Sequence, residues 1–329
     1  MKKLCQVWLL FLLSTILFAQ SKEPTNKIPR DTSFTIWGTN AKVTEHFPSA
    51  RLVKYKLAPG VVLHKDVIYQ ASNGRDLQMD IFTPAEKEKK SSAAVLIIHG
   101  GGWRSGERSM EWPTAVKLAE HGYVAATVEY RLSPEANYPA AIYALKAAIK
   151  WLRANSSKYN IDNDKIAVSG CSSGGELAAF LGVTGDLKKF EEKNSNSKYS
   201  SRVQAVINID GILDFTDPAE SGKDSLPSKP SSGKVWFGSS FKEKPELWIE
   251  ASPINYINEH CPPILFINSS LSRFHAGRDV MIEKLKRLKI NSEVHTIENT
   301  PHPFWLFHPW FDETMKYMLE FLDKTFKGK

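Results

Sequence analysis

Cysteine is scarce in this chain of 329 residues, which contains only Cys5, Cys171 and Cys261. That scarcity excludes a small exported domain stabilised mainly by disulfides. We expect Cys171 and Cys261 to remain free thiols. The chain also lacks an internal repeat, and beyond residue 18 it has no apolar run long enough to span a bilayer. A content of 42% hydrophobic and 24% charged residues is typical of a globular protein with a substantial core.

The one long apolar run lies at the amino terminus, from Leu4 to Phe18. Met1-Lys2-Lys3 precede it and Ala19-Gln20 follow it, which is the arrangement of a secretory signal. A membrane anchor is the alternative, but this run is shorter than the roughly twenty residues that a spanning helix needs. We therefore expect residues 1–20 to be a signal peptide, residues 21–58 a leader and extension, and the protein to be secreted or periplasmic.

A strong charge of either sign is also lacking, because 43 Lys and Arg face 36 Asp and Glu for a formal charge of +7. The basic residues are spread along the chain. This does not indicate a nucleic-acid partner, although it is compatible with an acidic polymer as substrate. We expect no membrane contact beyond the signal, and the sequence does not determine the oligomeric state.

Apolar runs alternate with amphipathic stretches from residue 59 to 329, which predicts an α/β fold: a doubly wound, mostly parallel sheet with helices on both faces. Asn73-Gly74 predicts a hairpin turn between the first two strands. Polar insertions are expected at about 185–201 and 214–252. The second carries aromatic residues and is either a substrate lid or a packed decoration. The predicted strands are 62–70, 77–82, 93–98, 123–127, 165–169, 203–209, 264–267 and 292–297, and the predicted helices are 113–121, 140–154, 176–181, 278–288 and 312–326.

The stretch Gly170-Cys171-Ser172-Ser173-Gly174 lies between a predicted strand and a predicted helix. Strand, glycine-flanked serine and helix are the layout of a nucleophile elbow, in which a sharp turn exposes the serine oxygen. An ordinary turn is the alternative, since Gly and Ser favour turns and the pattern occurs by chance. Ser172 is therefore the candidate nucleophile.

A serine nucleophile needs a base, a group that orients the base, and donors for the oxyanion. Residues just after successive parallel strands converge at one edge of the sheet. Residues 99–102, Ser172, Asp210 and His302 all follow predicted strands. Three consecutive glycines at 100–102 let the backbone approach a reacting oxygen closely, although they also suit a flexible turn.

Four motifs in order carry a family resemblance: HGGGW at 99–103, YRLSPE at 130–135, GCSSG at 170–174, and His302. In these the chain resembles the α/β-hydrolases, especially the hormone-sensitive-lipase-like group and bacterial feruloyl and acetyl-xylan esterases. The resemblance implies Ser172 as nucleophile and His302 as general base, with His308 as a weaker competitor. It also implies an oxyanion hole formed by the amides of Gly101, Gly102 and Ser173.

The acidic residue departs from the family pattern, because the segment 268–272 after the penultimate strand contains no carboxylate. Asp210 ends the preceding strand, and some lipases of this fold carry the acid there. Asp279 is the nearest acid downstream but falls where a helix starts, a position favoured by the helix dipole. We favour Asp210, with Asp279 as the alternative and Asp214 behind both.

The aromatic run 304–310 directly after His302 either stacks on a sugar or packs as a hydrophobic cover. Trp103 and Trp305 are the residues that we expect to contact substrate. Basic residues near strand ends suit a carboxylate such as that of a uronic acid, although such side chains are usually just solvated. These residues are Arg104, Arg131, Arg273, His275 and Arg278.

The sequence therefore predicts a serine esterase that removes acetyl or related acyl groups from xylan-like or pectin-like fragments, with no metal or cofactor. A peptidase of the same fold is one alternative. A non-catalytic carbohydrate-binding protein on the same scaffold is the other.

Overall fold

A computed structural model describes residues 31–71, 75–86, 90–133, 135–185, 187–192, 196–222 and 230–328. The signal expected at 1–20 and the turn expected at Asn73-Gly74 lie outside these ranges. Within them, no helix combines the length and the apolar character that a membrane span requires.

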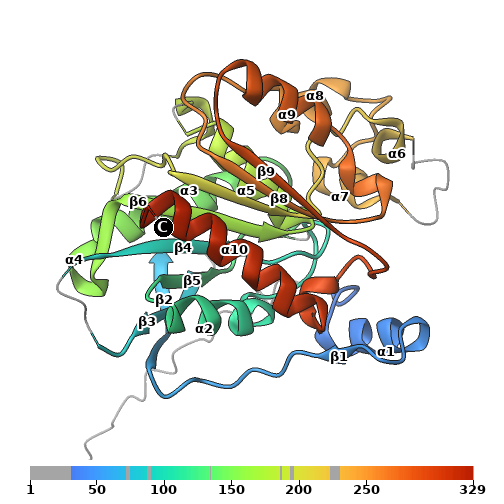
Figure 1. Cartoon of the computed structure of the whole chain (residues 1–329). Coiled ribbons are helices and arrows are strands. Elements are labelled where there is room, and N and C mark those ends of the chain that lie inside the picture. Colours follow the sequence, from blue (N-terminus) through green and yellow to red (C-terminus); the bar gives the residue numbers. More distant parts are fainter. Residues whose placement is uncertain are drawn as a thin grey trace, which may run out of the picture.

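An eight-stranded sheet forms the centre of the molecule (Figure 1), with the strand order β2-β3-β5-β4-β6-β7-β8-β9. The first two strands run antiparallel to their neighbours, and the other six are parallel. The predicted doubly wound, mostly parallel sheet is thus confirmed. The strands are β2 (Val61–Gln70), β3 (Leu77–Pro84), β4 (Ser92–Ile98), β5 (Val124–Val128), β6 (Ile161–Cys171), β7 (Ala205–Ile209), β8 (Ile264–Ser269) and β9 (Ser292–Ile297).

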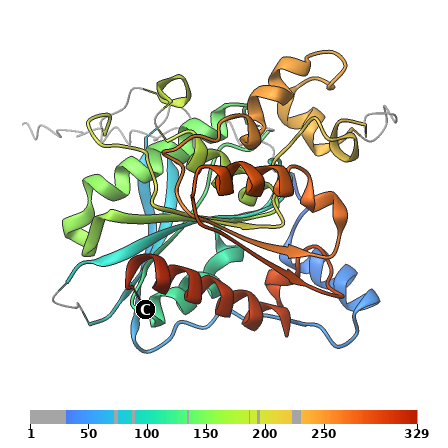
Figure 2. The same cartoon turned by 45° about the horizontal axis from the view of Figure 1, so that its top comes forward.

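The continuous apolar run in β4 reflects burial on both faces of the sheet. Its alternate residues Ala94, Leu96 and Ile98 belong to one core, and the residues between them belong to a second core on the opposite face. Figure 2 shows the two helical layers that cover these faces. One contains α3 (Ala140–Ala154), α5 (Ser173–Val183) and α9 (Arg278–Arg287), and the other contains α2 (Trp112–Glu120) and α10 (Trp310–Phe326).

The segment before residue 58 is more ordered than its sequence suggested. It contains α1 (Ile36–His46) and a short strand β1 (Arg51–Leu52) that pairs with β10 (Phe307–His308). Asp31 forms an isolated bridge with Ser105, in the loop that follows β4. The polar, proline-punctuated sequence hid these elements because their order depends on contacts with distant segments.

The insertion at 214–252 packs against the helix layer of α3 and α5 through aromatic side chains. Trp236 and Trp248 are buried, and the Phe237 ring contacts both of them at a tilt and meets Phe215 edge to face. Because these aromatic side chains are buried, the insertion fits a segment packed on the domain better than an open substrate lid. Its helices are α6 (Pro218–Ser221), α7 (Ser232–Phe237) and α8 (Pro245–Ala251). The remaining short helices are α4 (Ser156–Tyr159), η1 (Arg108–Glu111), η2 (Lys188–Phe190), η3 (Pro253–Asn255), η4 (Ser272–His275) and η5 (Phe304–Leu306).

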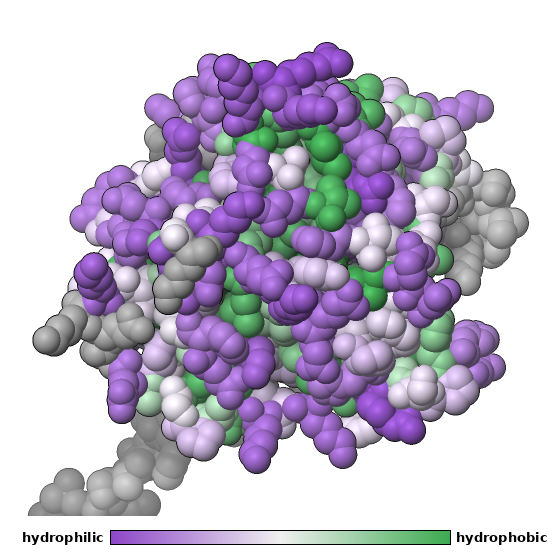
Figure 3. All heavy atoms as spheres, in the orientation of Figure 1, coloured by the Kyte–Doolittle hydropathy of each residue, from purple (hydrophilic) through white to green (hydrophobic). Residues whose placement is uncertain are grey.

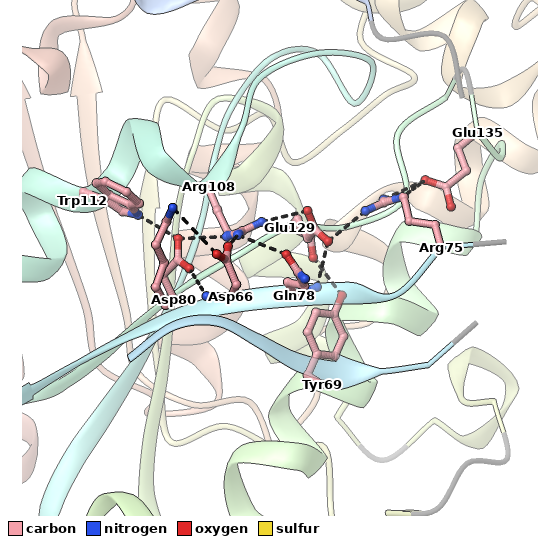
Figure 4. A network of polar contacts seen from close by, with 10 residues as sticks. Asp66, Tyr69, Arg75, Gln78, Asp80, Arg108, Trp112, Glu129 and Glu135 are labelled. Carbon is pink, nitrogen blue, oxygen red and sulfur yellow. Dashed lines mark hydrogen bonds and ion pairs between the residues drawn. The ribbon is translucent and has the colours of Figure 1, made fainter. Parts of the chain in front are cut away.

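A network of ion pairs ties the antiparallel edge of the sheet to η1 (Figure 4). Arg108 donates from Nε to Asp80 Oδ2 at 2.8 Å and from Nη1 to Glu129 Oε2 at 3.0 Å. Arg75 donates to Glu129 Oε1 and to Glu135 Oε2, both at 2.8 Å. Because η1 ends the loop that begins at β4, this network holds the far end of the glycine-rich segment 99–107.

On the face drawn in Figure 3, hydrophilic side chains dominate and hydrophobic ones show mainly in the gaps between them. Cys171 and Cys261 are both buried free thiols.

Candidate active site

Ser172 occupies a strained turn between β6 and α5. Its φ of 55° and ψ of −122° lie in a region that non-glycine residues rarely adopt. The backbone holds it there, because the Ser172 amide donates to Ile209 O at 2.7 Å. A Cβ on Gly174 would lie only 2.2 Å from Ile98 O, so the helix can approach β4 this closely only with glycine at that position. This is the geometry of a nucleophile elbow.

A chain of hydrogen bonds runs from Ser172 through His302 to Asp210. Ser172 Oγ lies 2.8 Å from His302 Nε2, and His302 Nδ1 lies 2.9 Å from Asp210 Oδ2. The residues come from the ends of three different strands, β6, β9 and β7. A hydroxyl, an imidazole and a carboxylate in this order have the geometry of a serine-hydrolase triad.

Asp210 is completely buried. Its carboxylate accepts hydrogen bonds from the end of β8, where the sequence contains no acidic residue. The Ser269 amide donates to Oδ1 at 2.8 Å, and its hydroxyl donates to Oδ2 at 2.7 Å. Asn268 Nδ2 adds a longer contact of 3.4 Å to Oδ1. The segment without a carboxylate thus supplies donors to the carboxylate on the neighbouring strand, which compensates for its burial.

The competing residues lie elsewhere. The Asp279 side chain is 78% exposed and forms an ion pair with Arg278 at the start of α9. Asp214 accepts from the amide and hydroxyl of Thr216. His308 pairs with Asp312 at 2.7 Å. The structure therefore contradicts the alternative that Asp279 binds His302.

A cavity of about 230 Å³ opens over Ser172 and His302, and Gly101, Gly102 and Ser173 are among the residues that line it. Gly101 has a φ of +126°, and a Cβ there would lie 2.1 Å from Ser105 O, so only glycine permits this loop conformation. Ser173 is the first residue of α5, where amides lack partners within the helix and the dipole favours negative charge. All three residues predicted to form the oxyanion hole thus border the cavity that contains the candidate nucleophile Ser172.

Two residues expected at the substrate do not line this cavity. Trp305 is 3% exposed, and its ring meets the edge of the His302 imidazole at 5.2 Å. His275 Nε2 lies 2.8 Å from Ser269 O. Both therefore support the site from behind, which corrects the prediction that they contact substrate. Phe274 instead stacks flat on His302, with ring centres 3.7 Å apart.

Trp103 lines the cavity but is mainly a packing residue, with only 5% of its surface exposed. Its ring stacks on Trp236 of the insertion at 4.8 Å, and its Nε1 donates to Glu176 Oε2 at 2.9 Å. Burial raises the pKa of Glu176 well above its ordinary value, although the hydrogen bond from the indole N–H opposes this rise. Trp103 thus fastens the glycine loop to α5 and to the insertion.

Of the five basic residues expected near the substrate, Arg104 and Arg273 line the cavity, and Arg131, His275 and Arg278 do not. Other residues that line the cavity were not predicted, because nothing in the sequence around them connects them to the elbow. They are Ser33, Phe34, Ser105, Ile212, Ser232 and Phe274. Within the described ranges, no cluster of three His, Cys, Asp or Glu side chains is arranged to hold a metal ion.

A further buried acid, Glu111, lies next to Cys171 of the elbow. Its Oε2 is 3.9 Å from Cys171 Sγ. Burial raises the pKa of Glu111 to about 7, against the opposing effect of hydrogen bonds from Trp305, Cys171 and Thr114. It therefore titrates near neutral pH, close to residues that support His302.

A family model described as BD-FAE matches residues 79–274, more than half of the chain. The chain belongs to the BD-FAE family. The BD-FAE match includes Ser172 and Asp210 and ends before His302. It agrees with the resemblance carried by the HGGGW, YRLSPE and GCSSG motifs, and that prediction is confirmed.

Curated relatives of this BD-FAE member include two proteins of Mycobacterium tuberculosis. "Esterase LipC" is 30% identical over 205 residues, covering 62% of this chain and 48% of LipC. "Probable carboxylic ester hydrolase LipM" is 27% identical over 247 residues, covering 73% of this chain and 56% of LipM. The chain thus spans about half the length of these relatives.

Solved structures share the fold. A "truncated form of carbohydrate esterase from gut microbiota" superposes with a TM-score of 0.66 at 24% identity, covering 80% of this chain and 97% of that one. Esterase Est2 of Thermogutta terrifontis gives a TM-score of 0.65 at 24% identity, with 81% and 92% covered. At these identities the comparison establishes the α/β-hydrolase fold alone.

Substitution of Asp210 and of Asp279 should have different effects on activity. Asp210→Asn replaces the carboxylate that accepts from His302 Nδ1 with a neutral amide, which no longer fixes the imidazole tautomer or stabilises the imidazolium, and lowers kcat by about 10³- to 10⁴-fold. Asp279→Asn, the matched control, leaves kcat unchanged because that side chain is exposed and remote from His302. Steady-state kinetics on an aryl acetate compare the two variants, and an equal loss in both would contradict the assignment.

The second prediction concerns Glu176, which acts on the glycine loop through Trp103. Glu176→Leu leaves the buried indole N–H without an acceptor, at a cost of about 1–3 kcal/mol, and kcat falls while KM changes little. Glu176→Gln keeps an oxygen that can accept the indole N–H and should keep kcat at the parent value. If Glu176→Leu lowers the melting temperature but keeps kcat, the residue is structural only.

The third prediction follows from the raised pKa of Glu111. Between its unfolded pKa of about 4.3 and its folded pKa of about 7, the folded state binds more protons, so stability falls as pH rises through this window. Glu111→Gln removes that loss. The parent should lose several degrees of melting temperature between about pH 5 and about pH 8 relative to the variant; parallel curves would show that Glu111 does not titrate there.

Proposed function

We propose that this protein is a serine esterase that releases acetyl or related acyl groups from polysaccharide fragments through an acyl-enzyme. The observation that carries the proposal is the hydrogen-bonded chain from Ser172 through His302 to Asp210, which ends at a cavity lined by Gly101, Gly102 and Ser173. Esterase names among the relatives agree with it.

In the first half-reaction, His302 Nε2 accepts the proton of Ser172 Oγ as the oxygen attacks the ester carbonyl. Negative charge develops on the carbonyl oxygen, and the amides of Gly101, Gly102 and Ser173 are the donors that stabilise it. Asp210 accepts the hydrogen bond of Nδ1–H, which fixes the tautomer and stabilises the imidazolium.

The first half-reaction ends when His302 gives this proton to the leaving alcohol, which departs and leaves the acyl group on Ser172. The second half-reaction hydrolyses this acyl-enzyme. A water molecule then enters, and His302 Nε2 takes its proton as the oxygen attacks the acyl carbon. Negative charge again develops on the carbonyl oxygen, and the same amides stabilise this second tetrahedral intermediate. Collapse of this intermediate releases the carboxylic acid and returns the proton to Ser172.

Two observations favour a carbohydrate ester over a simple lipid ester. The cavity presents hydroxyl and guanidinium groups beside aromatic rings, a mixture suited to a sugar with its many hydroxyls. A neighbouring structure carries the name "carbohydrate esterase". We also propose, from residues 1–20, that the protein is secreted or periplasmic, where polysaccharide fragments are accessible.

The test combines labelling with a substrate panel. A fluorophosphonate should label the folded protein at Ser172, whereas Ser172→Ala should remain unlabelled and inactive. Acid release is then measured on acetylated, methylated and feruloylated fragments of xylan and pectin, with short peptides as the peptidase control.

The outcomes separate the alternatives. An unlabelled folded protein would support a non-catalytic binding protein and overturn the esterase. Cleavage of peptides in preference to esters would indicate the peptidase. Hydrolysis of aryl acetates without release from any polysaccharide fragment would retain the esterase and reject the carbohydrate substrate.

A further inference from the structure

Arg273 is held rigidly at the wall of the cavity that contains Ser172 and His302. Its Nε donates to Glu220 Oε1, and its Nη2 donates to Glu220 Oε2 at 3.0 Å. The Glu220 carboxylate is only 7% exposed and belongs to α6 of the insertion, whereas the Arg273 side chain is 44% exposed. The guanidinium is therefore fixed in orientation before any ligand arrives.

The pairing with Glu220 occupies only one edge of the guanidinium. An arginine has five N–H donors, and the contacts to Glu220 use the edge formed by Nε and Nη2. The end formed by Nη1 and the second hydrogen of Nη2 has no acceptor among the residues that the structure describes. That end has the spacing that binds a carboxylate through two parallel hydrogen bonds.

A column of stacked groups sets the distance from Arg273 to the reacting atoms. The guanidinium carbon lies 5.0 Å from the centre of the Phe274 ring, and that ring lies 3.7 Å from the centre of the His302 imidazole. The guanidinium is thus at most about 9 Å from the imidazole that protonates the leaving alcohol. This is about the reach of one sugar ring with its substituents.

A second arginine at the cavity wall is also paired with a carboxylate. Arg104 lines the cavity and is anchored through Nε by Asp31 of the amino-terminal extension. The acidic group nearest the reaction, Asp210, is buried and accepts hydrogen bonds from Ser269 and His302. An anionic group in the cavity therefore has two guanidinium groups among the lining residues.

We propose that Arg273 makes the site selective for esters whose alcohol part is an acidic sugar, with a carboxylate on or next to the sugar that carries the acyl group. Glu220 is a positioning residue that keeps the end of the guanidinium turned to the ligand. The inference rests on the proposed esterase function and narrows its substrate from polysaccharide fragments in general to acylated uronic-acid fragments.

The experiment measures kcat/KM on two matched substrates, an acetylated oligogalacturonide and an acetylated xylo-oligosaccharide without uronic acid. The readout is the ratio of the two values for each variant, because damage to steps common to both substrates cancels. The parent should favour the acidic substrate, and Arg273→Gln should lower the ratio by about 10- to 100-fold, mainly through KM on the acidic substrate. Arg273→Lys keeps the charge but loses the paired donors, so it should recover only part of the ratio.

Arg287→Gln is the matched control, because it removes the same charge from an exposed position on α9 and should leave the ratio at the parent value. Added salt should reduce the preference of the parent for the acidic substrate and have little effect on Arg273→Gln. An unchanged ratio in Arg273→Gln, or a parent that favours the neutral substrate, overturns the inference and leaves the esterase proposal intact. If neither substrate is hydrolysed while Ser172 still reacts with fluorophosphonate, the carbohydrate proposal itself has failed.

Discussion

The backbone strain at Ser172 is the constraint on which the site depends. A positive φ at a serine persists only where surrounding contacts over-determine it, and here the contacts are backbone to backbone. Gly174 lets α5 approach β4, and Ile209 O accepts the Ser172 amide from the neighbouring strand. The same approach places Ser173, the first residue of α5, beside the cavity, so a single turn positions the proposed nucleophile and one predicted oxyanion donor.

The glycine loop after β4 is secured by four segments that are far apart in the sequence. The insertion stacks Trp236 on Trp103, and α5 accepts its indole N–H through Glu176. The extension binds the loop through Asp31, and the ion-pair network holds its far end through Arg108. Glycine amides are useful to a developing oxyanion only if they do not move as charge appears, and these contacts provide the stiffness that the glycines lack.

The fold was largely predictable because its signals are local. A strand covered on both faces is a continuous apolar run, as at 93–98, and α10 shows its buried stripe at Met315, Met318 and Leu322. The errors occurred where local pattern carries no such signal. The polar sequence of the extension indicated no role at the site, yet Phe34 lines the cavity. Aromatic character suggested substrate contact for Trp305, yet it is buried behind His302, because the same hydrophobicity serves a core and a binding face equally well.

By itself, the sequence determined the order of strands and helices and the candidate nucleophile, base and glycine loop, since each follows from residues adjacent along the chain. Only the tertiary structure decided which carboxylate meets His302. Asp210 lies 92 positions away from it, and their 2.9 Å contact depends on the register of β7, β8 and β9. The tertiary structure likewise decided which arginines border the cavity. A hydrogen bond requires two groups within a few tenths of an ångström of the right separation, and no local pattern specifies that.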